Sequence, residues 1–172
     1  MGCCSAQARR LAAVDEHVRR ENRHDIRGLV DMYTEDADFH DAAWRLHHRG
    51  QEAIRRYYDD LMQGLPDLHF DVLRRHACDQ TVIIEGVASG HHFGQWRGLP
   101  STGRRIELPM CAVFTFDEGD SFSGETIFYD RATVLRQLAM FHEPATVAGR
   151  FAAALMHPLT IARIVGRMVL RR

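Results

Sequence analysis

The spacing of apolar positions changes along the chain from a helical period to a strand-like one. In the first third, apolar side chains recur every three or four residues. This spacing predicts a helix over about 5–22, a second apolar stripe over 26–33 and a third helix with a clear stripe over 54–62. The stretch ADFHD is expected to form a short strand, and GLP at 64–66 should end the third helix.

The middle of the chain is rich in β-branched and aromatic residues and predicts consecutive strands. LHFDVLRRHAC and QTVIIEGVASGHHFG are two strands with a turn at Asp79 and Gln80. RGLPSTGRR is a loop before the strand RIELPMCAVFTF, and DEGD turns the chain into SFSGETIFYD. A helix over 131–141 follows, with Asp130 at its N-cap. Helices segregated from a meander indicate an α+β fold, with helices packed on one face of a curved antiparallel sheet.

Residues 144–172 have a different composition from the rest of the chain. They are apolar and contain five arginines but no acidic residue, whereas the whole chain has a net charge of −1. We therefore expect one domain over 1–143 and a basic amphipathic helical extension over 144–172, interrupted at Pro158. The extension is expected to pack on its own domain or on a partner subunit. Peripheral contact with an anionic membrane is the alternative.

Composition excludes several classes of protein. The chain has 172 residues, of which 45% are hydrophobic, so it can bury a sizeable core. The nearly neutral charge argues against a nucleic-acid binder. Its four cysteines have no zinc-like or disulfide-framework spacing, which favours a cytoplasmic location. All 22 basic residues are arginine, so no lysine can form a Schiff base or act as a base.

Four stretches carry a family resemblance: MYTEDADFHDAAW, RGQEAIRRYY, GHHFGQWRGLPSTGRRIEL and FYDRATVLRQL. Over about residues 28–140 the chain resembles the SnoaL-like polyketide cyclases of the nuclear transport factor two-like superfamily. The resemblance implies a cone-shaped fold with a deep pocket between the concave face of the sheet and the helices. It further implies cofactor-independent chemistry on a small hydrophobic ligand, and a homodimer formed through the outer sheet face.

In these cyclases an aspartate on the last strand acts as general acid and base, and a histidine on the preceding strand assists. The resemblance places these positions at Ile127 and Ala112, and neither side chain can move a proton. The neighbours of Ile127 are Thr126 and Phe128, so a register slip of one residue restores no carboxylate. The sequence therefore keeps the scaffold but lacks the family's known acid.

Replacement groups can be proposed from strand alternation. If Ile127 faces the pocket, Glu125 and Tyr129 point the same way. Glu125 would be either a general acid with a raised pKa or, the favoured interpretation, a solvated carboxylate near the strand end. Tyr129 would donate a hydrogen bond to an enolate or serve as a core aromatic. Asp41 is the leading base, with His40 beside it, against the alternative of a turn residue.

The remaining candidates are assigned to binding or to structure. His92 is expected to face inward and supply a hydrogen bond, while His47 and His48 are placed in a solvated loop. No metal site is expected, because adjacent histidines in a strand point to opposite faces and no H-x-H set appears. Glu85 is expected to meet solvent or an arginine of a neighbouring strand. The expected substrate-binding residues are Tyr33, Trp44, Met110, Phe114 and Ile127.

These observations favour an enzyme without a cofactor. The expected chemistry is acid–base catalysis of a cyclisation, isomerisation or dehydration, on a hydrophobic polyketide-like or terpenoid-like substrate. The alternative is a non-catalytic ligand-binding or assembly module that has lost the family's acid and base. Epoxide hydrolysis would need two aspartates and an arginine around a water, a set that the sequence spacing does not assemble.

Overall fold

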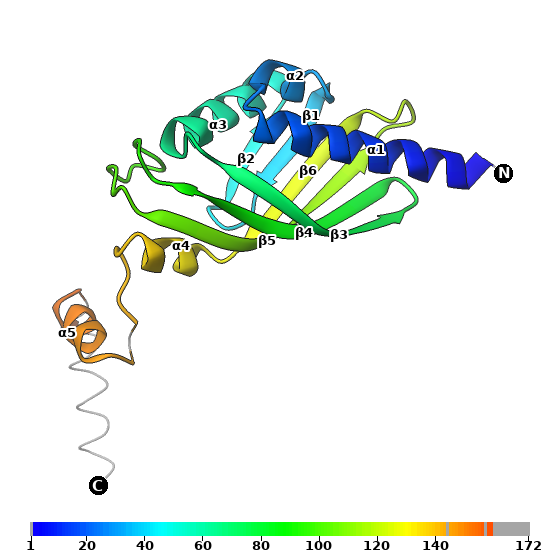
Figure 1. The fold of residues 1–172 in the computed structure, drawn as a ribbon. Helices are drawn as coiled ribbons and strands as arrows, with labels where there is room; N and C mark the ends of the chain where they lie inside the picture. The colour runs from blue at the N-terminus through cyan, green and yellow to red at the C-terminus, as the bar shows by residue number, and fades with distance from the viewer. Residues whose placement is uncertain (1, 144, 157, 160–172) are drawn as a thin grey trace, which may run out of the picture.

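Three helices cover one face of a curved, six-stranded sheet (Figure 1). The structure is a computed structural model that describes residues 2–143, 145–156 and 158–159. The covering helices are α1 (Gly2–Asn22), α2 (Ile26–Val30) and α3 (Gln51–Gly64). The strands are β1 (Tyr33–Asp41), β2 (Leu46–Arg49), β3 (His69–Cys78), β4 (Thr81–His91), β5 (Arg105–Phe116) and β6 (Phe122–Tyr129). This arrangement confirms the predicted α+β class.

The sheet order is β2-β1-β6-β5-β4-β3. Neighbouring strands are antiparallel except for β1 and β6, which run parallel. The sequence had suggested a wholly antiparallel sheet. The sheet is instead mixed, because it contains this one parallel pair. The reason is the route of the chain: α3 carries it across to β3 at the far edge, and the meander then returns to place β6 beside β1.

The predicted loop around His47 and His48 was wrong, because both residues lie in β2. This strand pairs with β1 in an antiparallel register that sets His47 opposite His40 and His48 opposite Phe39. β2 has four residues, lies at the edge of the sheet and alternates between exposed and half-buried side chains. A short edge strand of polar residues carries little hydrophobic periodicity, so its pattern resembled that of a loop.

Burial alternates along β4, as expected for a sheet with one covered face. Val82, Ile84 and Ala88 are buried beneath the helices. Glu85 faces the other way, and its Oε2 accepts a hydrogen bond of 2.6 Å from Nη2 of Arg74 on β3. The ion-pair interpretation of Glu85 is therefore confirmed.

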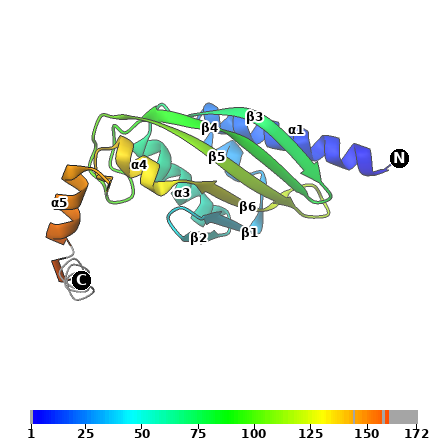
Figure 2. The ribbon, with the colours of Figure 1, turned by 90° about the horizontal axis from the view of Figure 1, so that it is seen from below.

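Two further helices follow the sheet. α4 (Arg131–Gln137) is shorter than predicted, because Leu138 is its C-cap and Ala139 has a positive φ of 59°. α5 (Val147–Met156) lies beyond α4, away from the sheet (Figure 2). Its apolar side chains Phe151 and Leu155 are largely exposed. Residues 144, 157 and 160–172 of the predicted basic extension lie outside the described residues. No described helix is both long and apolar enough to span a membrane.

The start of α4 provides a test of local stability. Asp130 caps the helix by accepting hydrogen bonds from the backbone N–H groups of Ala132 and Thr133, as predicted. We expect Asp130→Ala to lower the free energy of unfolding by about 1 kcal/mol in urea denaturation. Asp130→Asn keeps the cap but loses the exposed ion pair with Arg136, so it should change stability by only a few tenths of that value. Equal losses in both variants would show that charge, rather than capping, matters here.

Candidate functional site

A cavity lies between the concave face of the sheet and helices α1 and α3. Most of its wall is aliphatic or aromatic, and polar groups are confined to a few positions. The described residues that line it are His17, Glu21, Phe39, Tyr57, Tyr58, Leu61, Leu65, Leu68, Phe70, Ile84, Ala88, Trp96, Ile106, Leu108, Met110, Ala112, Phe114, Glu125, Ile127 and Tyr129. Such a wall suits a hydrophobic ligand that presents a small number of polar groups.

Strand β6 supplies three side chains to this cavity, at alternate positions. Glu125, Ile127 and Tyr129 all line the cavity. This confirms the prediction that Glu125 and Tyr129 share the face of Ile127, because alternate side chains of a strand point the same way. Each lies opposite a residue of β5 that lines the same cavity: the pairs are Glu125 with Phe114, Ile127 with Ala112 and Tyr129 with Met110. The two strands thus form one continuous wall.

The middle pair of this wall is the one that the family resemblance singles out. Ile127 and Ala112 are direct cross-strand neighbours and are 6% and 3% exposed. They occupy the positions at which the resemblance places an aspartate and a histidine. Ile127 and Ala112 therefore form an apolar belt across the cavity. The polar residues Glu125 and Tyr129 lie two positions before and two positions after Ile127 on β6, on either side of this belt.

Glu125 lies on one side of the belt, in a buried polar cluster. Its side chain is 4% exposed, so the favoured expectation of a solvated carboxylate was wrong. The Tyr33 hydroxyl donates a hydrogen bond to Oε2 of Glu125, and the Tyr58 hydroxyl lies 3.5 Å from the same oxygen. Nε2 of His17, on α1, is 3.8 Å from it. Helices α1 and α3 therefore enclose the carboxyl group that β6 presents.

Burial determines the protonation of this cluster. Desolvation raises the pKa of Glu125 to about 8, and the charge of Glu21 adds to the shift. The hydrogen bonds from Tyr33 and Tyr58 act in the opposite direction. Desolvation also lowers the pKa of His17 to about 3. At neutral pH, Glu125 is therefore mainly an uncharged acid and His17 a neutral imidazole, so their contact is not an ion pair.

Asp41 is the last residue of β1, is fully buried and lies in register with Ile127, and its carboxylate reaches Tyr129 on the other side of the belt. Its carboxylate accepts hydrogen bonds from the Tyr129 hydroxyl at 2.9 Å and from the Trp44 backbone N–H at 3.2 Å. The Tyr57 hydroxyl and Nη2 of Arg97 each lie 3.5 Å from Oδ2. Asp41 does not line the cavity, but Tyr129 and Tyr57 do. The carboxylate therefore reaches the cavity through tyrosine hydroxyls.

Arg97 connects this second cluster to helix α3. It lies in the loop after β4 with a positive φ of 53°, and its guanidinium stacks over the Tyr57 ring at 4.8 Å. Nη1 of Arg97 also pairs with Asp60 at 3.0 Å. The structure thus assembles a row of aspartate, arginine and aspartate that the sequence spacing did not reveal. Neither Asp41 nor Asp60 lines the cavity, so this row supports its wall rather than enclosing a water in it.

The other predicted site residues divide into two groups. Met110, Phe114 and Ile127 line the cavity, and Tyr33 reaches it through Glu125. The second group lies outside the cavity lining. His92 is fully buried, with Nδ1 3.2 Å from the Thr102 hydroxyl, and desolvation lowers its pKa.

Two candidates at the end of β1 also lie outside the lining. Trp44 packs edge-on against Trp96, with ring centroids 5.9 Å apart. His40 is exposed on the outer face, one residue from the inward-facing Asp41, so it does not stand beside that carboxylate in the interior.

Five polar groups of this site were not predicted from the sequence: His17, Glu21, Tyr57, Tyr58 and Arg97. The two tyrosines were assigned only to the apolar stripe of the third helix, and His17 was overlooked within α1. The sequence did indicate that His17 is buried, because His17 lies on the same face of α1 as the apolar residues Val14 and Val18. A histidine on an apolar helical face must find a partner in the interior.

Comparison with known proteins places the chain by family and by fold. The family model described as the SnoaL-like domain matches residues 14–123. No curated protein matches the chain significantly.

Several solved structures share the fold. The chain is 21% identical to a provisionally assigned polyketide cyclase from Xanthomonas campestris pv. campestris, with a TM-score of 0.70 over 77% of this chain and 98% of that one. AclR, a provisionally assigned hydroxylase from Streptomyces galilaeus, is 19% identical with a TM-score of 0.69, over 79% and 99% of the two chains. SalBIII, an epoxide hydrolase/cyclase-like enzyme of pyran ring formation in the polyether salinomycin, is 20% identical with a TM-score of 0.63, over 72% and 92%.

The buried carboxyl of Glu125 generates a prediction about pH and stability. Its pKa is about 8 in the folded protein and near 4.5 in an unfolded chain. Between these pH values the folded state retains a proton that the unfolded state releases, so stability falls as the pH rises. Glu125→Gln removes the titrating carboxyl group, and with it this pH-dependent loss of stability. We expect the variant to gain stability relative to the parent from pH 5 to pH 8.5, by on the order of a few kcal/mol, in urea denaturation.

His17 stays neutral from pH 5 to pH 8.5 in both folded proteins, so comparing them at each pH reports the titration of Glu125 together with its charge coupling to Glu21. Unfolding curves that keep the same separation from pH 5 to pH 8.5 would contradict a raised pKa for Glu125.

Proposed function

Since this chain belongs to the SnoaL-like domain family, we propose that it catalyses cofactor-independent acid–base chemistry on a hydrophobic, carbonyl-bearing substrate. The observation that carries the proposal is the enclosed carboxyl of Glu125, which lines an otherwise largely apolar cavity and is mainly protonated at neutral pH. A neutral carboxylic acid in such a place can donate a hydrogen bond or a proton to a developing oxyanion. Aldol cyclisation, isomerisation of a double bond beside a carbonyl and dehydration of a β-hydroxy ketone all proceed through such a species.

The wall of the cavity supports a polyketide-like or terpenoid-like substrate. Aromatic and aliphatic side chains make up most of the lining, and they favour a flat or branched hydrocarbon skeleton. The polar groups are separated: the Glu125 cluster lies on one side of the Ile127–Ala112 belt and the Tyr129–Asp41 pair on the other. Glu125 and Tyr129 are four residues apart on one strand, about 13 Å between their Cα atoms. The substrate would therefore be extended, with reactive positions several bonds apart.

The Tyr129–Asp41 pair is the proposed base. The Tyr129 hydroxyl donates to Asp41, and burial together with the Asp41 charge raises the pKa of Tyr129. A free tyrosinate is thus disfavoured, and the two groups would act together. The Tyr129 oxygen would accept a proton from the substrate while its own proton passes to Asp41, and Glu125 would protonate the substrate oxygen. Return of these protons to the product would restore the site.

The similar structures are consistent with this class of chemistry without naming a reaction. They include proteins assigned as polyketide cyclases and an epoxide hydrolase/cyclase-like enzyme. Identities near 20% show the shared fold alone, and one fold hosts many reactions. A non-catalytic binder remains the second candidate, because the Ile127–Ala112 belt carries neither acid nor base.

Exchange of carbon-bound hydrogen tests the proposal without knowledge of the substrate. We expect the protein to accelerate deuterium incorporation from D₂O at the γ carbon of hydrophobic enones such as a steroid 4-en-3-one, where the exchanged hydrogen lies several bonds from the carbonyl oxygen, measured by proton NMR. Glu125→Gln should slow this exchange by about 10²-fold or more, since general acid–base groups contribute 10²–10⁴-fold. Glu85→Gln is the matched control, because that carboxylate lies on the outer face in an ion pair with Arg74.

Each outcome of the exchange experiment decides between the candidates. Exchange lost in Glu125→Gln and retained in Glu85→Gln supports the enzyme. Ketones that broaden or shift on binding but gain no deuterium above the buffer rate support the binder. Equal exchange in both variants would remove Glu125 from the mechanism.

The proposed base gives a separate prediction. Asp41→Asn keeps the size and the polar contacts of the side chain but cannot take a proton, and Tyr129→Phe removes the hydroxyl that links Asp41 to the cavity. We expect each variant to lose about 10²-fold or more of the exchange rate, and the double variant to lose no more than the worse single one, since the groups act as a unit. Thermal unfolding should show that both variants fold. Losses that multiply in the double variant would show that the two residues act independently.

A further inference from the structure

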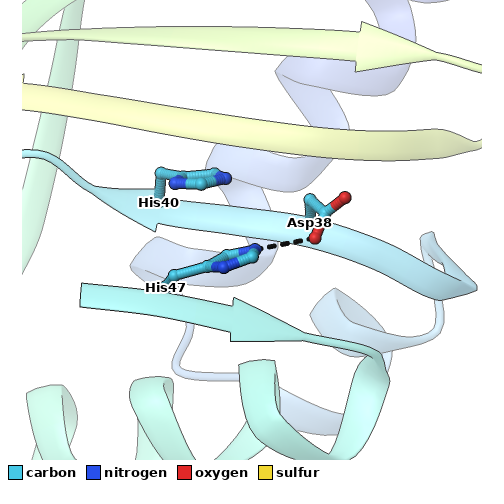
Figure 3. Close-up of side chains that lie close together, drawn as sticks. All are labelled: Asp38, His40 and His47. Atoms are coloured by element: carbon cyan, nitrogen blue, oxygen red, sulfur yellow. Dashed lines mark hydrogen bonds and ion pairs between the residues drawn. The ribbon is translucent and has the colours of Figure 1, made fainter.

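The outer face of the β1–β2 ribbon carries three metal-ligating side chains that the proposed chemistry does not use. Asp38 and His40 alternate along β1 and therefore share a face, and His47 of β2 lies directly opposite His40 (Figure 3). The residues between and after them, Phe39 and Asp41, are buried on the other face. The three side chains thus project away from the cavity.

The atoms of Asp38, His40 and His47 that can bind a metal lie close together. One atom from each residue lies within 4.8 Å of the other two. Nε2 of His47 is 2.7 Å from Oδ1 of Asp38, and the His40 and His47 rings stack with centroids 4.1 Å apart and planes inclined by 12°. Figure 3 shows the His40 ring stacked above the His47 ring, with a His47 nitrogen directed at the Asp38 carboxylate. Among the described residues, these three form the one such group.

The donor set suits a divalent transition metal. Imidazole nitrogen and carboxylate oxygen bind Zn²⁺ at about 2.0–2.2 Å, so neighbouring ligand atoms in a tetrahedral site lie roughly 3.3–3.5 Å apart. Closing from the observed spacing needs the two stacked imidazole rings to turn until their in-plane lone pairs converge, a movement open to exposed side chains on a fixed backbone ladder.

A second feature points to a bound ligand. A hollow adjoins the two histidines, lined by His40, Asp41, Ala42, Arg45, Leu46, His47 and Thr126. It leaves space for the water or additional donor that a three-ligand zinc site requires in its fourth position. Arg49 lies opposite Asp38 across the ladder, and its charge opposes that of a bound cation.

We propose that Asp38, His40 and His47 form a binding site for a divalent transition-metal ion, represented by Zn²⁺, on the outer face of the β1–β2 ribbon. Such an ion joins β1 to the short edge strand β2 through side-chain bonds. No metal site was predicted from the sequence, because adjacent histidines in a strand point to opposite faces and no H-x-H set appears. Here a D-x-H pair on one strand meets a histidine of the next strand, and only the pairing register brings the third ligand in. The site does not depend on the proposed catalysis.

Calorimetric titration of Zn²⁺ into the full chain, with its thiols kept reduced, tests the site. We expect a saturable component with one ion per chain. His40→Ala, His47→Ala and Asp38→Asn should each weaken that component about tenfold or more, because loss of even an outer-sphere partner costs 10–100-fold at metal sites. The three side chains are exposed, so metal-free thermal unfolding should be nearly unchanged in every variant.

The matched control is His69→Ala. His69 and Asp71 also alternate along a strand and face each other at 3.3 Å, with side chains 53% and 67% exposed, but that pair lies outside the three-ligand group. Its loss should leave the Zn²⁺ component unaltered. The proposal is overturned if the parent protein shows no saturable component, if the His40 and His47 variants retain full affinity, or if His69→Ala weakens binding equally.

Discussion

The two-residue period of β6 is the constraint on which the interior depends. Because alternate side chains of a strand share a face, fixing Ile127 toward the cavity also fixes Glu125 and Tyr129 there. The strand cannot bury its apolar residue without burying an acid on one side and a phenol on the other. Neighbouring polar groups meet this requirement: Tyr33, Tyr58 and His17 surround the acid, and Asp41 accepts a hydrogen bond from the phenol.

Burying Glu125 carries an energetic cost that the hydrogen bonds offset only in part. A carboxyl group removed from water favours its neutral form, and the raised pKa shows that desolvation outweighs the two tyrosine hydroxyls. A neutral amide at this position would be expected to fold more stably at and above neutral pH. Retention of such a costly group beside a cavity is typical of a functional site, where stability is exchanged for chemistry.

Much of the fold could be predicted from the sequence, because its signals are local. The stripe of α3, the strands β3 to β6 and the Asp130 cap all follow from periodicity or from residue type at one position. The site was less accessible. The burial of Glu125 depends on α1 and α3 packing across β6, at sequence separations of 108 for His17 and 67 for Tyr58, a contact that no local pattern encodes. The role of Arg97 could not be predicted for a related reason. The backbone of its loop directs the guanidinium toward Asp41, and no local sequence pattern indicates that direction.

The parallel pairing of β1 with β6 has a consequence for how the chain acquires its structure. Without β6, the order of strands leaves two separate pieces, the β2-β1 ribbon and the β5-β4-β3 meander. β6 is the last strand along the chain and the only neighbour common to both pieces within the described sheet. During synthesis the ribbon therefore waits for about seventy intervening residues before the sheet can close, and pairings between distant segments form slowly. The cavity arises at that same step, so a chain truncated before β6 would present two incomplete apolar surfaces and no binding site.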